Sequence, residues 1–293
     1  LYYANPAWAG ITLLPWIPKY DENGNHNVNI ASNSYQNPRA TALYDDQWNK
    51  SYKMSGTMYL RWEPVKNLVM ETRNSAEMEF GNGRRYWNPL ADGAPGGSEA
   101  TLQTSKNQYV NLTTSNTINY SNVFGGYHSL RVLAGQEATS YKYEYSYVYA
   151  PNVDPAMPYP NTAPQSGVES SVSFSNETML SFFGIADYNY DNRYFVQATV
   201  REDGSSLFGA KNKWGLFWSA SASWNISNER WMENTKNWLS LLKIRASYGL
   251  NGNNGIGPYQ AYGVYASSQY NNVVGMLPSR PANDYLSWEK NST

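Results

Sequence analysis

The chain has 293 residues, a net charge of −1, only 15% charged residues and no cysteine. The balanced charge argues against a nucleic-acid partner, and the lack of cysteine excludes a disulfide framework and a thiolate metal site. No run of about 18 apolar residues is present, so the sequence predicts no transmembrane helix.

Residues 1–50 are rich in Pro, Asn, Tyr and Trp and show no sustained alternation. We expect them to form a long, ordered external loop. Alternation of apolar and polar positions begins in the next segment, where Met58, Leu60 and Trp62 share one face of a predicted strand. A turn at 64–67 leads to a return strand with a strongly polar second face. That face carries Val69, Glu71, Arg73, Ser75, Glu77 and Glu79.

A long loop is predicted at 81–105, followed by a second hairpin around Gly125 and Gly126. Beyond Glu137, alternate positions from Tyr141 to Tyr149 are all tyrosine. Side chains alternate between the two faces of a strand, so these tyrosines form a ladder on one face. They share the phase of Arg131, which places the ladder on the polar side. A Pro-rich loop at 150–168 precedes the next predicted strand.

The clearest strands lie between residues 193 and 250. In the middle one, Trp218, Ala220, Ala222 and Trp224 alternate with serines. Such alternation is shared by transmembrane barrels and soluble β-sandwiches, so by itself it does not say what covers the apolar face. Aromatic residues at the ends and small residues between them are the arrangement expected of the two interfacial girdles of a barrel.

The length of the apolar stripe also favours lipid. From Leu242 to Leu250 it spans about 26 Å, at roughly 3.3 Å per residue. At a strand tilt of about 40° it covers about 20 Å of height, close to the roughly 25 Å apolar band of a barrel. Arg201, Lys243 and Arg245 fall on the opposite face, as lipid requires, because each would cost about 2–4 kcal/mol at the bilayer midplane. A large soluble sandwich or solenoid remains the alternative.

The turns alternate between short and long ones, which is typical of barrels with short periplasmic turns and long external loops. The pattern predicts an all-β, antiparallel barrel segment with about eight complete strands and loops between residues 51 and 250. Residues 285–293 would start the next strand. Residues 251–284 fit either an external loop or an additional hairpin.

Three segments, Arg201–Gly209, Lys213–Ser227 and Leu242–Gly249, carry in order motifs that resemble those of the SusC/RagA family of TonB-dependent outer-membrane transporters. Arg201–Gly209 resembles the family's "RRDGSSRFG", and Lys213–Ser227 its "RWGxFPSxSAGWxIS". Leu242–Gly249 is similar to "LKLRASYG", and Trp288–Lys290 to the "LKWEKT" with which a strand of the family starts. Shorter matches occur at 133–137, 188–190 and 251–253. The chain departs from the family at Trp218, where Pro is usual, and at Ile185, where Arg is common.

The resemblance implies that the chain is a mid-barrel segment of a longer protein with a 22-stranded barrel. The family's plug and N-terminal domains are absent from this segment. The resemblance assigns 251–284 to an external loop. It also implies import of oligosaccharides or peptides across the outer membrane of a Gram-negative bacterium, with energy from TonB and a SusD-like surface lipoprotein as a lid.

Candidate cargo-binding residues are aromatic side chains in the predicted loops, because such rings stack on sugars. They are Trp16, Tyr20, Trp87, Tyr149 and Tyr159. A soluble β-rich glycan-binding module is the alternative that the same aromatics allow. An enzyme is the weakest interpretation, since His26 and His128 share no recognisable motif. We expect no cofactor and no metal.

Overall fold

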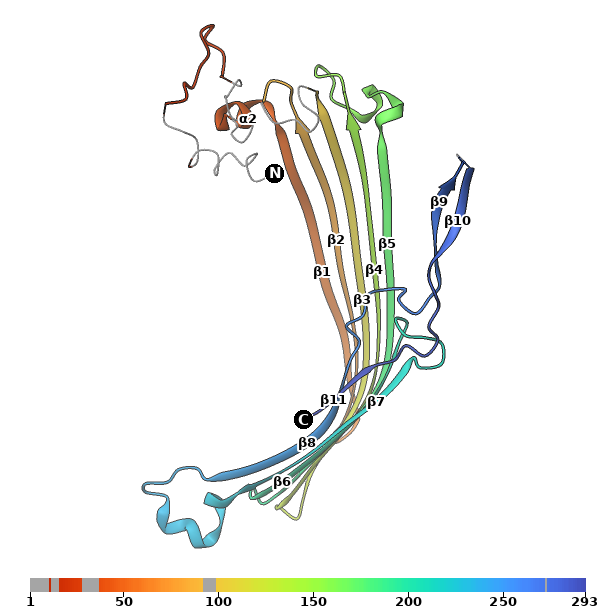
Figure 1. Ribbon diagram of the computed structural model, residues 1–293. Coiled ribbons are helices and arrows are strands. Elements are labelled where there is room, and N and C mark those ends of the chain that lie inside the picture. The colour runs from red at the N-terminus through yellow and green to blue at the C-terminus, as the bar shows by residue number, and fades with distance from the viewer. Residues whose placement is uncertain (1–10, 12–15, 28–36, 92–98, 272) are drawn as a thin grey trace. The chain divides into compact units, whose positions relative to one another are not determined.

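The computed structural model describes residues 11, 16–27, 37–91, 99–271 and 273–293. A nine-stranded sheet dominates it, with strands in the order β1-β2-β3-β4-β5-β6-β7-β8-β11 (Figure 1). The strands are β1 (Asp46–Val65), β2 (Leu68–Trp87), β3 (Thr101–Phe124), β4 (His128–Pro151), β5 (Glu169–Tyr190), β6 (Tyr194–Ser205), β7 (Trp214–Asn225), β8 (Lys243–Asn253) and β11 (Glu289–Ser292). The predicted all-β fold with eight complete strands and the start of a ninth is confirmed.

The helices in the described residues are short and lie between or before the strands. They are α2 (Pro38–Tyr44), η2 (Pro160–Thr162), η3 (Gln165–Gly167), η4 (Ile226–Asn228) and η5 (Arg230–Thr235). Asn37 caps α2, its side-chain oxygen accepting from the backbone N–H groups of Arg39 and Ala40. Within the described ranges, no helix is long and apolar enough to cross a membrane.

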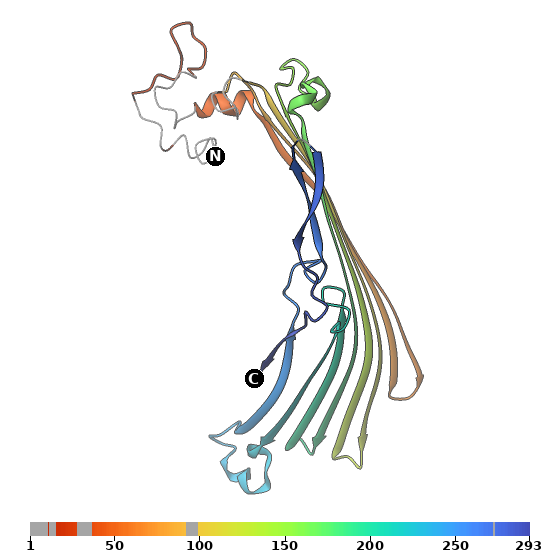
Figure 2. The same cartoon turned by 45° about the vertical axis from the view of Figure 1, so that its right-hand side comes forward.

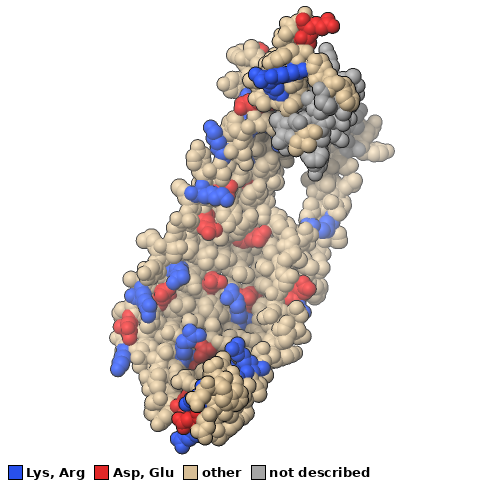
Figure 3. Space-filling model, turned by 90° about the vertical axis from the view of Figure 1, so that its left-hand side faces the viewer, with Lys and Arg blue, Asp and Glu red and all other residues tan. Residues whose placement is uncertain are grey.

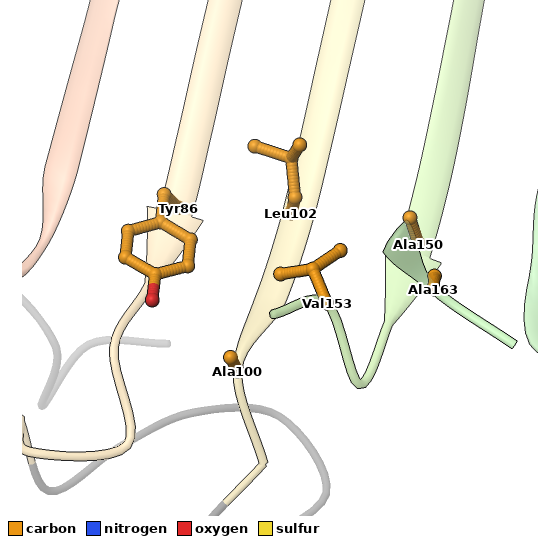
Figure 4. Close-up of a cluster of buried hydrophobic side chains, with 6 residues drawn as sticks. All are labelled: Tyr86, Ala100, Leu102, Ala150, Val153 and Ala163. Carbon is orange, nitrogen blue, oxygen red and sulfur yellow. The ribbon is translucent and has the colours of Figure 1, made fainter. Parts of the chain in front are cut away.

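The chain divides into two compact units. Unit 1 comprises residues 1–54, 78–109 and 143–174, and unit 2 comprises residues 55–77, 110–142 and 175–293. Unit 1 has a small apolar core at the loop ends of its strands (Figure 4). It is formed by Tyr86, Ala100, Leu102, Ala150, Val153 and Ala163. Because the loop residues Val153 and Ala163 pack onto residues of β2, β3 and β4, this core holds the 152–168 loop against the strand ends.

In unit 2, the register of β5 to β8 pairs apolar residues mainly with apolar ones and polar residues mainly with polar ones, so rows that run across the four strands are mainly apolar or mainly polar. Ala186 pairs with Ala198, Ala198 with Ala220, and Ala220 with Tyr248. One residue along, Asp187, Gln197, Ser221 and Ser247 form a polar row in the same way. We call the two sides of these strands the apolar face and the polar face.

The apolar face carries no second layer of protein in the described part of the chain. Val196 on β6 is 51% exposed, Trp218 on β7 is 44% exposed and Ile244 on β8 is 58% exposed. A stripe of large apolar side chains without protein cover is what a lipid-facing barrel wall needs. A buried sandwich core would show the opposite. The tight turns after β1, β3 and β5 are visible at the bottom of Figure 2.

Arg201, Lys243 and Arg245 lie on the polar face, as predicted. Lys243 and Arg245 pair with Asn225 and Ser223 in the polar rows. Arg201 bonds Asp203 at 2.6 Å and Glu137 at 3.3 Å, so its guanidinium is neutralised within the sheet surface. In the view of Figure 3, basic and acidic side chains are interspersed, with no large block of either sign.

The loop between β6 and β7 is folded onto the segment before β11. Phe208, Phe217 and Trp288 form a buried cluster, and the Trp288 indole donates to the Lys213 carbonyl oxygen at 3.0 Å. Gly209 packs so closely that a Cβ there would overlap the Asp284 backbone. The motif that carries the family resemblance at Arg201–Gly209 therefore has a structural role.

The turn between β7 and β8 is fixed by Glu229. Its carboxylate accepts hydrogen bonds from the Tyr194 hydroxyl at 2.7 Å, the Trp224 indole at 2.9 Å and the Arg193 guanidinium at 3.1 Å. The pKa of Glu229 is lowered, first by the Tyr194 hydrogen bond, then by those from Trp224 and Arg193. The ionised carboxylate thus ties this turn to the preceding hairpin.

Two parts differ from the sequence-based expectation in detail. The first strand begins at Asp46, and β2 and β3 continue into the predicted 81–105 loop, to Trp87 and from Thr101. Residues 251–284 contain a hairpin of β9 (Val264–Tyr270) and β10 (Val273–Arg280), which forms a separate two-stranded sheet. That region is thus a long connection that carries its own hairpin.

Candidate ligand-binding site

A hollow of about 490 Å³ opens on unit 1 at the loop-side parts of β1 to β4. We call it the amide pocket. It is lined by Gln47, Trp48, Asn49, Gly83, Arg84, Arg85, Gln103, Ser105 and Tyr145. Its size is within the range of small-ligand sites, which span about 300–1,000 Å³.

Most of this lining comes from one face of the strands. Each of β1, β2 and β3 contributes two residues that are two positions apart and therefore share a face. These pairs are Gln47 and Asn49, Gly83 and Arg85, and Gln103 and Ser105. Gly83 and Arg85 are in phase with Glu79, which is on the predicted polar side of β2. Tyr145 belongs to the predicted tyrosine ladder. The amide pocket is therefore a hollow in the polar side of the wall.

A missing side chain creates the floor of the amide pocket. A Cβ on Gly83 would lie 2.5 Å from the Ser105 Oγ and 3.8 Å from the Asn49 Oδ1. A larger residue would displace the Ser105 hydroxyl and fill the space between β1 and β3. Glycine lets a ligand approach the β2 backbone closely.

The two arginines of the amide pocket have different environments. Arg84 donates to the Asp46 carboxylate at 2.9 Å and to the Pro158 carbonyl oxygen at 3.1 Å, which also anchors the 152–168 loop. Arg85 lies over the Trp87 ring, with its guanidinium carbon 5.4 Å from the ring centroid. Among the described residues, Arg85 forms no ion pair.

The five aromatic residues predicted from the sequence all belong to unit 1. None of them lines the amide pocket. Trp16 and Tyr159 are 74% and 60% exposed, Tyr149 is half-buried, and Trp87 is buried beneath Arg85. Tyr20 is 43% exposed and stacks on His26, with 5.2 Å between ring centroids. As cargo contacts these residues stay a prediction.

Sequence reasoning missed most of the amide pocket because its side chains are ordinary ones. Gln, Asn and Ser residues occur throughout the strands, and only pairing of four strands gathers these particular ones. Tyr145 was the one available signal, through the tyrosine ladder. The two histidines play separate parts: His26 stacks on Tyr20, and His128 Nδ1 contacts the Tyr188 hydroxyl at 2.7 Å.

An open antiparallel sheet with one exposed apolar face and one polar face defines a segment of β-barrel wall. Comparison with solved structures agrees. The chain superposes on the structure of the RagAB peptide transporter with a TM-score of 0.82 and 23% identity, covering 94% of this chain and 31% of that one. The RagAB peptide importer in the 'open-open' state gives a TM-score of 0.80 at 22% identity.

Proteins similar in sequence indicate a narrower class of protein than the fold does. The chain is 27% identical to TonB-dependent receptor P26 of Formosa agariphila over 292 residues, 95% of this chain and 29% of that receptor. It is 29% identical to receptor P3 of the same organism over 282 residues, 94% of this chain and 28% of that receptor. TonB-dependent receptor SusC of Bacteroides thetaiotaomicron is 36% identical over 136 residues, 43% of this chain and 13% of SusC. No family model matches the chain.

These similarities confirm the resemblance to TonB-dependent receptors of the SusC/RagA type. The chain spans under a third of the length of the receptors P26 and P3.

Proposed function

We propose that the whole protein is an outer-membrane importer of the SusC/RagA type in a Gram-negative bacterium. It takes up oligosaccharides, or peptides, with energy delivered by TonB, and a SusD-like surface lipoprotein acts as a lid. The segment is part of a 22-stranded barrel. It contributes an external loop at 1–50, barrel strands and loops at 51–250, a further external loop at 251–284 and the start of a strand at 285–293.

The alternation of faces in register across β5 to β8 is the observation that carries this proposal. An uncovered apolar face with Trp218 and Trp224 at its ends matches a lipid boundary. The polar rows beside it match a wet interior, where charged groups such as Arg201 stay hydrated or paired. A wall of this kind separates lipid from an aqueous path.

The proposed cargo contacts are exposed aromatic rings of unit 1. Trp16, Tyr20 and Tyr159 present ring surface on which sugar rings can stack. Tyr149 belongs to the tyrosine ladder, and Trp87 supports the amide pocket by holding Arg85. Replacing the exposed rings with alanine in the full-length protein is expected to weaken cargo binding without lowering the amount of receptor in the membrane.

Extraction and uptake of the full-length protein test the function. An importer stays with outer membranes in high salt and is released by detergent, and deletion of its gene abolishes growth on its cargo as sole nutrient. Release by salt alone would favour a soluble glycan-binding module and would overturn the proposal.

A further inference from the structure

We propose that the amide pocket binds an acidic sugar unit of an oligosaccharide, with Arg85 pairing to its carboxylate. The inference rests on the proposed function, because it names the chemical class of the cargo at one site on the wall.

Charge at the amide pocket is one-sided. Two guanidinium groups line it, and none of its lining residues is acidic. Arg84 is neutralised by Asp46, whereas Arg85 has no carboxylate partner in the described residues and is held by the Trp87 ring. Stacking leaves the N–H edge of a guanidinium free, and that edge matches a carboxylate in two parallel hydrogen bonds. Arg85 is therefore preorganised for an anion.

One further cation, Lys50, contacts a ring of the pocket lining. Lys50 Nζ lies 4.9 Å from the centroid of the Trp48 ring, which lines the pocket. Lys50 is exposed. Lys50 is in the opposite phase of β1 to Gln47 and Asn49, so among the described residues Arg85 remains the unpaired cation of the pocket lining.

The remaining lining favours a sugar over a peptide. Gln47, Asn49 and Gln103 each offer both a donor and an acceptor, and Ser105 and Tyr145 add hydroxyl groups. Sugar hydroxyls also donate and accept, so they satisfy such groups in pairs. No aliphatic side chain lines the pocket, and its aromatic rings, Trp48 and Tyr145, offer flat surfaces on which a sugar ring can stack. The open floor at Gly83 admits a flat sugar ring.

Binding by the purified full-length protein in detergent tests this assignment. The ligands are a short oligogalacturonate, its fully methyl-esterified form and a short polyglutamate, measured by titration calorimetry at low and high salt. The variants are Arg85→Gln, which keeps a planar hydrogen-bonding group without charge, and Gly83→Val, which fills the floor. Lys106→Gln is the matched control, since Lys106 is an exposed cation of β3 in the opposite phase to Ser105.

The wild-type protein is expected to bind the free acid about tenfold more tightly than the ester, a difference of about 1.4 kcal/mol. High salt should reduce that preference, because screening weakens ion pairing. Arg85→Gln should remove the preference while retaining ester binding, Gly83→Val should weaken both sugars, and Lys106→Gln should change neither.

Equal binding of acid and ester by the wild type, or an unchanged preference in Arg85→Gln, would overturn the proposal. So would tighter binding of polyglutamate than of oligogalacturonate. If Arg85→Gln fails to assemble, Gly83→Val replaces it as the test variant. Unchanged sugar binding by Gly83→Val would then contradict the proposed site. If the protein imports its cargo but does not prefer the free acid to the ester, only the proposal of an acidic-sugar site is refuted. If it binds the free acid selectively but imports nothing, only the proposed importer function is refuted.

Discussion

Arginine substitutions at two adjacent positions of β7 separate the two faces of the wall. Ala222 lies on the apolar face, paired with Val196 and Ala246, whereas Ser221 lies on the polar face, paired with Gln197 and Ser247. Ala222→Arg puts a charge into hydrocarbon if the apolar face meets lipid. Ser221→Arg puts the same charge into water.

The expected size of the effect follows from the position of Ala222 between the two girdle tryptophans. Trp218 and Trp224 are six residues apart, about 20 Å along the strand and about 15 Å in height at a tilt of about 40°. Ala222 is thus about 5 Å in height from Trp224, near the middle of the stripe. An arginine there is expected to cost about 2–4 kcal/mol, which lowers the ratio of assembled to unassembled protein about 30- to 700-fold.

The assay is the fraction of full-length receptor that migrates as a folded barrel in unheated gel samples of outer membranes. Ala222→Arg should lose most of that fraction, and Ser221→Arg should match the wild type to within about 0.5 kcal/mol, as most surface substitutions do. Normal assembly of Ala222→Arg together with loss of Ser221→Arg would refute the assignment of the faces.

Three further predictions concern the ends of the strands. The pKa of Glu229 is lowered in the folded state by its hydrogen bonds, so the stability it adds is complete above the ordinary pKa of a glutamate and is lost as the pH falls through the lower folded pKa. Proteolysis of the β7–β8 turn should therefore rise on acidification in the wild type, while Glu229→Gln should be cut readily even at neutral pH. Gly209→Ala should lower the melting temperature, since overpacking costs about 1–3 kcal/mol, whereas Gly56→Ala, with open space around it, should not. Trp288→Phe keeps an aromatic ring but loses the hydrogen bond to Lys213, so a cost of about 1 kcal/mol is expected in the same melting assay; an unchanged melting temperature would show that this bond adds nothing.

The strands between residues 193 and 250 could be predicted from sequence because their two-residue period is unbroken. Each slip of one residue would exchange the faces, so the pattern also determines the register. The pattern puts Arg245 and Ser223 on the polar face, and the structure pairs the two residues. The start of β1 could not be predicted in this way, since Lys50 interrupts the apolar positions between Trp48 and Tyr52 and breaks the alternation.

The amide pocket lay beyond sequence reasoning for a different reason. It depends on four strands being aligned and on Gly83 leaving space beside Ser105. Aromatic residues were the visible candidates, yet Trp87 is buried and acts through Arg85. Motif resemblance located the Arg201–Gly209 segment, and only the packing of Phe208 on Trp288 shows that the segment stabilises the loop.

The lipid contact of the apolar face can be measured directly with a single nitroxide label at position 222 or 221 of the full-length protein in lipid vesicles. Molecular oxygen concentrates in hydrocarbon and a water-soluble nickel complex does not enter it, so their collision rates with the label report its surroundings. The label at 222 is expected to collide with oxygen and to be shielded from nickel, and the label at 221 to show the reverse. Free access of nickel to position 222 would contradict the membrane assignment.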